Sequence, residues 1–356
     1  MMKKTKLLTI LVGLAMGGAE HMAFELIRSI DKNEYEPIVL CTGLKLNTPL
    51  EKDMEEICQV EYYGHTGKIT PLTLLGVMRK ISAIKPDIVH AHMGAVAYAV
   101  PWTGLHNKPL VITVHTKPEK AFSKANEYLV RRALNRHNTM LVAVSEDNYY
   151  KVRDYFGLLN NICYINNGIN IDRFKSVDHD GFVFINVARQ DENKNQAIII
   201  RAFSRLNKEN PKSKLFLIGD GPCHEELIKI TEELCLTSKI VIPGQIAAPE
   251  EYYAQADVYV QSSHREAMPL SVLEAMATGL PIISTDVGGL TDVIKDNGYI
   301  VPDNDEEELY NAMHRISKLD HESFVAMSRS SKDISKMYSS DKMAEEYSTL
   351  YKTLTR

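Results

Sequence analysis

Short apolar runs that alternate with amphipathic helical segments are the feature that most constrains the fold of this chain. The alternation runs from Lys6 to Ile165 and begins again at Phe182. Strands that are apolar throughout and separated by helices are typical of parallel sheets covered on both faces. Since 356 residues exceed the usual size of one hydrophobic core, we expect an α/β protein with two Rossmann-like, doubly wound parallel-sheet domains.

The predicted domain boundary lies where the hydrophobic periodicity is lost, between Asp172 and Gly181. This stretch follows a turn cluster at Asn166–Asn170. We therefore expect an N-terminal domain over residues 1–175 and a C-terminal domain over residues 176–338.

The segment 339–356 lies beyond the second set of strands and contains a last predicted helix at about Asp341–Leu354. We expect this helix to pack back on the N-terminal domain. Two doubly wound domains imply a central cleft, and in such sheets ligands bind outside the carboxyl ends of the strands, near helix N-termini. The turns that follow the predicted strands are therefore the candidate site.

The most informative stretch is His264–Gly289, which has the pattern of a loop, a short helix, a turn and a strand. Pro269 suits the first helical position, and Gly279 suits the residue just after the helix. The pattern predicts a helix over about Pro269–Thr278 and a buried strand over Leu280–Ser284.

Two glutamates flank the start of this helix, Glu266 in the preceding loop and Glu274 about one and a half turns into it. The first-turn amides of Leu270 and Ser271 are unpaired donors at the positive end of a helix dipole, which favours anions such as phosphate. A carboxylate there can accept hydrogen bonds from sugar hydroxyls. The alternative is a solvated polar stripe, since Ser271, Glu274 and Thr278 share helical spacing.

Arg189 and Lys194 follow the predicted strand Phe182–Val187. Two cations five residues apart at a strand's carboxyl end can clamp a diphosphate through charge-assisted hydrogen bonds. The alternative is a surface loop with incidental charges.

Gly18 opens a predicted helix after the first strand, where glycine allows close approach of a ligand, although turn formation alone also explains it. His115 ends the predicted strand Leu110–Val114, and a structural histidine is an equal alternative to a functional one.

Other site types receive little support. The two Asp-x-Asp sequences, Asp178–Asp180 and Asp303–Asp305, lie in the boundary segment and at a predicted helix start, where Asp is expected as a cap, so we expect no metal. The turn Gly219–Gly221 lacks the third glycine of a dinucleotide fingerprint. We expect no bound cofactor.

Cysteine usage and charge suggest a location and partners. The five cysteines are scattered without Cys-x-x-Cys spacing, which favours a reduced cytoplasmic protein. Residues 1–175 carry a net charge of +5 and the remainder −10, within a total of −5. The basic segment 117–136 favours peripheral contact with anionic lipid at the inner face of a membrane, although a solvated basic helix face also explains it. Nucleic acid is not an expected partner.

The apolar run Leu7–Leu14 follows Lys3, Lys4 and Lys6, and this pattern resembles a secretory signal peptide. It leads directly into Gly17-Gly18 and an amphipathic helix, which favours a first buried strand instead. The sequence contains no apolar run long enough to span a bilayer.

Taken together, the chain resembles the retaining glycosyltransferases of family GT4, which have the two-domain GT-B fold. The resemblance spans nearly the whole chain. Its most specific part is Glu266 with the run Glu274–Pro281 and the pair Gly288-Gly289. Supporting parts are the following segments, in order: Gly17–Glu20, Asn167–Asn170 with Phe174, Arg189 with Lys194, and Gly219–Pro222.

The resemblance implies a hexosyltransferase with a nucleotide-sugar donor, UDP-sugar favoured over GDP-sugar, bound mostly by the C-terminal domain. It implies that Arg189 and Lys194 hold the diphosphate and that Glu274 binds the ribose. Glu266 would contact the donor sugar. The remaining implied contacts are the amides of Leu270 and Ser271 with phosphate, Gly18 near the phosphates from the other domain, and His115 near the reacting sugar.

The resemblance also implies metal-independent transfer to a glycan or lipid-linked acceptor and, by analogy with the family, a role in surface polysaccharide biosynthesis. One departure is that Ala267-Met268-Pro269 stands where many relatives have glycines, and Pro269 offers no N–H. Two alternatives stay open: an epimerase acting on UDP-GlcNAc at C2, and a non-catalytic scaffold of the same fold.

Overall fold

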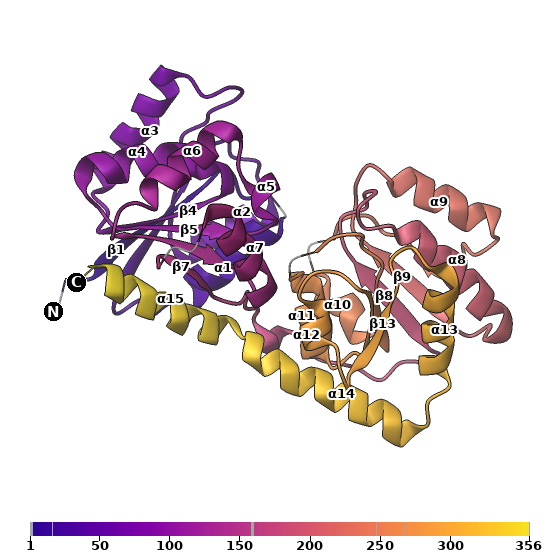
Figure 1. Ribbon diagram of the computed structural model, residues 1–356. Coiled ribbons are helices and arrows are strands. Elements are labelled where there is room, and N and C mark those ends of the chain that lie inside the picture. Colours follow the sequence, from indigo (N-terminus) through magenta and orange to yellow (C-terminus); the bar gives the residue numbers. More distant parts are fainter. Residues whose placement is uncertain (1–2, 16, 158–159, 247, 267, 356) are drawn as a thin grey trace. The chain divides into compact units, whose positions relative to one another are not determined.

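The computed structural model describes residues 3–15, 17–157, 160–246, 248–266 and 268–355, which form two compact units. The first unit comprises residues 1–168 and 340–356, and the second comprises residues 169–339. Each unit contains one fully parallel sheet with helices on both faces (Figure 1). The two units therefore have the Rossmann-like α/β architecture expected from the sequence. The units divide at 168/169 and 339/340, against 175/176 and 338/339 in the sequence-based prediction.

The sheet of the first unit has the strand order β3-β2-β1-β4-β5-β6-β7. Its strands are β1 Thr5–Leu11, β2 Tyr35–Cys41, β3 Gln59–Tyr62, β4 Ile88–His92, β5 Leu110–Val114, β6 Thr139–Ala143 and β7 Ile162–Tyr164. Its helices are α1 Gly18–Ser29, α2 Pro49–Ile57, α3 Pro71–Ile84, α4 Val96–His106, α5 Pro118–Ala121, α6 Lys124–Ala133, α7 Glu146–Phe156 and α15 Ser340–Thr355.

The predicted first strand is confirmed, because β1 lies inside this sheet between β2 and β4, and Leu7, Leu8 and Ile10 are fully buried. Alternate residues of β1 enter two separate cores. Leu8 and Ile10 pack in the core that contains α3, α4 and α6, and Leu7 packs in the core that contains α1 and α15. The run Leu7–Leu14 therefore starts as a buried strand.

Helix α15 packs on the first unit although it follows the second unit in the chain (Figure 1). Tyr347 and Tyr351 are fully buried in a core with residues of β1, β4 and α1. Arg28 of α1 donates a 2.8 Å hydrogen bond to the hydroxyl of Ser340. The last helix thus completes one face of the first sheet.

The sheet of the second unit has the order β10-β9-β8-β11-β12-β13. Its strands are β8 Val183–Val187, β9 Lys214–Ile218, β10 Ile240–Val241, β11 Val258–Gln261, β12 Ile282–Thr285 and β13 Gly298–Val301. Its helices are α8 Gln196–Glu209, α9 His224–Glu233, α10 Glu250–Ala254, α11 Leu270–Thr278, α12 Leu290–Val293, α13 Glu306–Ser317 and α14 His321–Ser335. Large buried clusters lie on both faces of the sheet.

Several elements differ from the sequence-based prediction, and α10, α12 and β13 have no counterpart in it. The sequence also predicts a helix over Ala121–His137, but α6 is shorter and ends at Ala133. It begins only at Lys124, because the Ser123 hydroxyl accepts from Asn126 N and caps it. Helix α2 has no counterpart in the prediction, although Thr48 and Glu51 form a capping box. Pro269 is the N-cap of α11 rather than its first residue, with an extended ψ of 132°. Gly279 ends this helix in the left-handed conformation, as predicted.

Candidate functional site

The second unit places its predicted site residues at the carboxyl ends of two neighbouring strands, β8 and β11. The strand order reverses between them, because the sheet grows outward from β8 to β9 on one side and from β11 to β12 on the other. Ligands of doubly wound sheets bind at such a switch point. The chain after β8 carries Arg189 and Lys194, and the chain after β11 carries Glu266 and α11.

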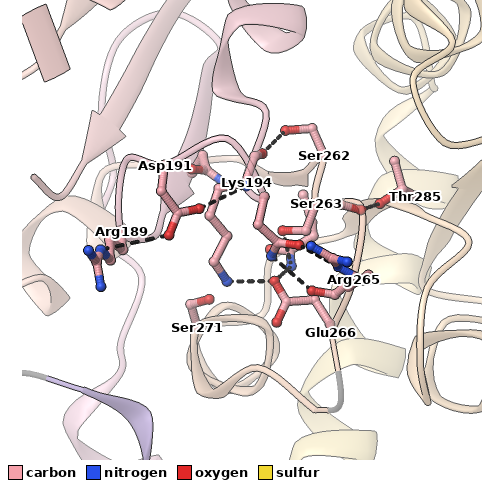
Figure 2. Close-up of polar contacts among 12 residues, drawn as sticks. Arg189, Asp191, Lys194, Ser262, Ser263, Arg265, Glu266, Ser271 and Thr285 are labelled. Carbon is pink, nitrogen blue, oxygen red and sulfur yellow. Dashed lines mark hydrogen bonds and ion pairs between the residues drawn. The ribbon is translucent and has the colours of Figure 1, made fainter. Parts of the chain in front are cut away.

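Lys194 and Glu266 form an ion pair at this position, with Nζ 2.5 Å from Oε1 (Figure 2). Both side chains are largely buried, at 19% and 11% exposed. The Lys194 loop is held by Ser262, whose hydroxyl donates to the carbonyls of Lys194 (2.7 Å) and Asn195 (3.0 Å). A partly dehydrated ion pair of this kind fixes the position of a cation and of a carboxylate before any ligand arrives.

Arg189 is oriented differently, since its side chain is 69% exposed. Its only ion pair within the described residues is with Asp191, at 3.7 Å. Asp191 also accepts from the amide of Lys194 at 3.2 Å and so connects the two basic residues (Figure 2). The structure thus brings Lys194 together with Glu266, while Arg189 lies at the surface of the same loop.

Two glycines allow this loop to pack closely on the following turn. A Cβ at Gly219 would lie 2.0 Å from the carbonyl oxygen of Ala188, and a Cβ at Gly221 would lie 2.3 Å from that of Gln190. Both glycines also have positive φ, at 132° and 159°. The turn that lacks the third glycine of a dinucleotide fingerprint therefore uses its two glycines to let the Arg189 loop pack against it.

Helix α11 begins at the same edge of the sheet. The amides of Leu270 and Ser271 belong to its first turn, where the helix itself supplies no acceptor. The Ser271 hydroxyl lies 2.8 Å from the hydroxyl of Tyr259. Tyr253 donates hydrogen bonds of 3.0 Å to the Ser271 carbonyl and to Oε2 of Glu274.

The two tyrosines are fully buried beneath α11. Burial raises the pKa of both phenols, and the nearby Glu274 carboxylate raises the pKa of Tyr253 further. Each phenol therefore stays protonated and acts as a donor. Sequence reasoning missed them, because Tyr253 in α10 and Tyr259 in β11 cannot be told from ordinary core residues by sequence pattern alone.

In the first unit, Gly18 is the first residue of α1 and follows the N-cap Gly17. A Cβ added at Gly18 would meet no described atom within 4 Å. Packing within the described chain therefore does not require glycine at this position.

His115 directly follows β5 and is joined to a second histidine. Its Nε2 lies 2.8 Å from Nδ1 of His92, and the two rings stack at 5.1 Å. His90 lies next to His92, with ring centroids 4.3 Å apart. Its Nδ1 is 2.7 Å from the Tyr351 hydroxyl, and its Nε2 is 2.7 Å from Oγ1 of Thr113.

This histidine row, which we define as His90, His92 and His115, is electrically neutral. Burial lowers the pKa of His115 to about 4 and that of His90 to about 3. Burial also lowers the pKa of His92, and the neighbouring histidines lower it further. The sequence does contain the signal, since two histidines two residues apart on a strand share one face, but it was not used.

The second of the two Asp-x-Asp sequences has a structural explanation. Asp305 is the N-cap of α13, as predicted, and Asp303 pairs with His264 at 2.8 Å. Within the described residues, no group of three or more His, Cys, Asp and Glu side chains is placed to hold a metal ion.

The basic segment 117–136 is partly committed to internal contacts. Arg136 donates to the carbonyls of Thr103 (3.1 Å) and Lys108 (2.8 Å). Arg131 pairs with Glu127 at 2.8 Å and lies over two aromatic rings. No helix in the described part of the chain is long and apolar enough to cross a membrane.

Comparison with known proteins identifies the class. Residues 16–173 match the family described as Glycosyltransferase Family 4, and residues 169–333 match Glycosyl transferases group 1. The chain belongs to these GT4 glycosyltransferases of the GT-B fold, as the sequence motifs indicated.

Individual proteins support this assignment. The uncharacterized glycosyltransferase MJ1059 of Methanocaldococcus jannaschii is 26% identical over 59% of this chain and 58% of its own length. An Escherichia coli UDP-Gal:α-D-GlcNAc-diphosphoundecaprenol α-1,3-galactosyltransferase is 25% identical over 69% of this chain and 70% of its own length. Anabaena HepE in complex with UDP and glucose superposes with a TM-score of 0.85, at 18% identity over 98% of this chain and all of that one.

Proposed function

We propose that this protein transfers a hexosyl unit from a nucleoside-diphosphate sugar, with a UDP-sugar favoured over a GDP-sugar, to a glycan or glycolipid acceptor. The observation that carries the proposal is the buried Lys194–Glu266 pair beside the first-turn amides of α11, for which the described residues supply no acceptor, at the switch point of the second sheet. That arrangement offers positive charge for a diphosphate and a carboxylate for sugar hydroxyls. The solved complex of HepE with UDP and glucose supports the choice of donor class.

Each residue then has a separate role. Lys194 and Arg189 neutralise the departing diphosphate, assisted by the amides of Leu270 and Ser271. Glu274, which accepts from Tyr253, binds the ribose hydroxyls. Glu266 binds a hydroxyl of the transferred sugar. Within the first unit, Gly18 approaches the phosphates and His115 acts next to the reacting sugar.

The reaction proceeds with retention of anomeric configuration and without a metal ion. The bond between the anomeric carbon and the diphosphate oxygen breaks ahead of attack, and the nucleoside diphosphate leaves with the bonding electrons. The acceptor hydroxyl then attacks on the same face and passes its proton to the departing phosphate. The protein's part is mainly electrostatic stabilisation of that leaving group.

Donor binding provides the first test. We expect UDP to raise the melting temperature, and we expect one member of a panel of UDP-glucose, UDP-galactose, UDP-GlcNAc and GDP-mannose to be hydrolysed slowly in the absence of an acceptor. NMR of the sugar product would show the anomeric configuration retained, and EDTA would leave the rate unchanged. A protein whose melting temperature responds to no nucleotide would favour a non-catalytic scaffold. Conversion of UDP-GlcNAc to a second hexosamine nucleotide without acceptor would favour an epimerase.

The acceptor and the location are proposed by analogy. The E. coli relative acts on a diphosphoundecaprenol-linked sugar, which supports a lipid-linked acceptor in surface polysaccharide biosynthesis. We place the protein in the cytoplasm, with peripheral contact to anionic lipid through the basic segment 117–136. Flotation with anionic and neutral liposomes tests this contact. Equal recovery with both would contradict it.

A further inference from the structure

Gln261 is a fully buried polar residue at the carboxyl end of β11 that has no part in the proposed function. The rest of this strand is apolar or aromatic, so an amide here needs specific partners to offset its desolvation. It has three. The Tyr259 hydroxyl donates to Oε1 at 3.0 Å, and Nε2 donates to the Ser263 hydroxyl at 3.1 Å and to Oε1 of Glu266 at 3.0 Å.

These partners fix the orientation of the amide. The opposite orientation would turn the carbonyl oxygen of Gln261 toward the Glu266 carboxylate, where two acceptors would face each other. The Tyr259 hydroxyl keeps its proton, because burial raises its pKa, and it lies 3.0 Å from the carbonyl oxygen in this orientation, 2.8 Å from Oγ of Ser271 and 3.3 Å from the Val187 carbonyl. The amide N–H is thereby directed at Glu266.

Glu266 consequently receives two donors on the same oxygen. Lys194 Nζ and Gln261 Nε2 both contact Oε1, at 2.5 Å and 3.0 Å. None of the described residues makes a hydrogen bond with Oε2. Figure 2 shows Lys194 reaching Glu266 across the first turn of α11, with Ser271 beside the pair. One carboxylate oxygen is thus occupied by the protein, and the other remains available as an acceptor.

We propose that Gln261 is a positioning residue, oriented by Tyr259, that holds Glu266 with Oε1 on Lys194 and Oε2 turned to accept a hydroxyl of the transferred sugar. This inference rests on the proposed function, because it assigns the ligand of Glu266. It predicts that the Tyr259–Gln261 pair affects recognition of the sugar and leaves recognition of the nucleotide unchanged.

The test compares affinities for UDP and for the nucleotide sugar in Gln261→Leu, which keeps the apolar bulk and removes the amide. Titration calorimetry uses UDP, UDP-glucose, UDP-galactose and UDP-GlcNAc on the full chain. We expect the affinity for UDP to stay within about twofold and that for the preferred UDP-sugar to fall about 10- to 100-fold, the range for one hydrogen bond to a charged group. Tyr259→Phe keeps the ring and removes the hydroxyl that contacts the Gln261 amide. It should lower the ratio of UDP-sugar affinity to UDP affinity about threefold.

The matched control is Gln255→Leu, at an exposed glutamine of the same unit that donates to the Glu251 carbonyl. It should leave both affinities unchanged. Equal loss of UDP and UDP-sugar affinity in Gln261→Leu would mean a merely structural role and would overturn the inference, as would wild-type affinity for both. If the wild-type protein binds neither UDP nor any UDP-sugar, the donor-site assignment itself fails, and this inference fails with it.

Discussion

The two units carry their candidate residues in opposite electrostatic settings. In the first unit, His115 is held by another neutral imidazole, 2.8 Å away, within a row that continues to the phenol of Tyr351. In the second unit, Glu266 is held by a cation 2.5 Å away and by the amide of Gln261. Both sets lie at the carboxyl ends of interior strands, and the order of the six strands of the second sheet matches that of the first six strands of the first sheet.

Similar sheets thus hold their candidate site residues in two ways, by neutral hydrogen-bonding groups in the first unit and by an ion pair in the second. The histidine row is buried and uncharged, so it resists protonation and offers directional hydrogen bonds. The ion pair in the second unit offers fixed charge, which is what a diphosphate requires. We therefore expect the two units to respond differently to substitution and to pH.

The largest difference is expected from removing the cation of the second unit. Lys194→Ala should lower turnover about 100- to 1000-fold, because a preorganised charge next to the leaving group is lost. The fold should stay intact, while the melting temperature falls because Glu266 is left without its cation. Steady-state assays of UDP release measure the turnover. The control is Lys229→Ala, at a lysine that is 75% exposed and pairs with Glu233. Near-wild-type turnover in Lys194→Ala would remove the diphosphate clamp from the mechanism.

Acid should destabilise the first unit before the second. Unfolded histidine has a pKa of about 6.5, and His115 and His90 are lowered to about 4 and about 3, so the unfolded chain binds more protons between these values. Stability is fully present above about pH 6.5 and falls by about 1.4 kcal/mol per pH unit for each histidine as the pH drops toward 4. Hydrogen exchange at pH 7 and pH 5 should show protection lost in β4 and β5 and retained in β8 and β11. Uniform loss in both sheets would contradict this difference.

Replacing His92, the partner of His115, should lower activity less than replacing Lys194. The Nε2 of His92 is buried and has no hydrogen-bond partner among the described residues, and a buried lone pair is less costly to leave unpaired than an N–H. His92 Nδ1–H therefore donates to His115 Nε2, which leaves His115 Nδ1 protonated.

Replacing His92 removes that constraint on the tautomer. His92→Asn should lower kcat about 10-fold with little change in the KM for the donor, if a positioned imidazole acts in the chemical step. The exposed His106→Asn provides the control in the same unit. An unchanged kcat would show that His115 needs no support from the row.

The smallest effect is expected from replacing Tyr347, the residue of α15 that contacts the histidine row. Tyr347 lies 2.9 Å from the Thr113 hydroxyl, and its ring packs 5.2 Å from His90. Tyr347→Phe should cost about 1 kcal/mol of unfolding free energy, the net value of one hydrogen bond, and should leave catalysis unchanged. Denaturant titration measures the stability. A loss of activity without a loss of stability would mean that α15 acts on the site and not only on the fold.

Local patterns allowed much of the fold to be predicted. Helix α7 spans Glu146–Phe156, the range predicted from the sequence, and Gly279 ends α11 as predicted. Helix α2 was missed although Leu50, Met54 and Ile57 have helical spacing and Thr48 with Glu51 forms a capping box. The break between α5 and α6 was missed because Ser123 was not recognised as a cap inside a long amphipathic run.

Site residues could be predicted from the sequence only where they belong to a local motif. Lys194 and Glu266 lie 72 residues apart, and the motif brought both to attention without indicating that they touch. Gln261 gave no signal, because its role depends on Tyr259 below it and on Glu266 in the next loop. His92 gave a signal only in combination with its neighbouring strand. Such partnerships arise from strand order, which a single sequence does not display.

The packing of α15 on the first sheet also determines when that unit can be completed. Residues 340–355 are synthesised after the whole second unit, yet their tyrosines close the face of the sheet that holds His90. On the ribosome, the first unit therefore lacks α15 on this face until the whole second unit has been synthesised. The second unit, whose strands and helices are contiguous in the chain, can finish first.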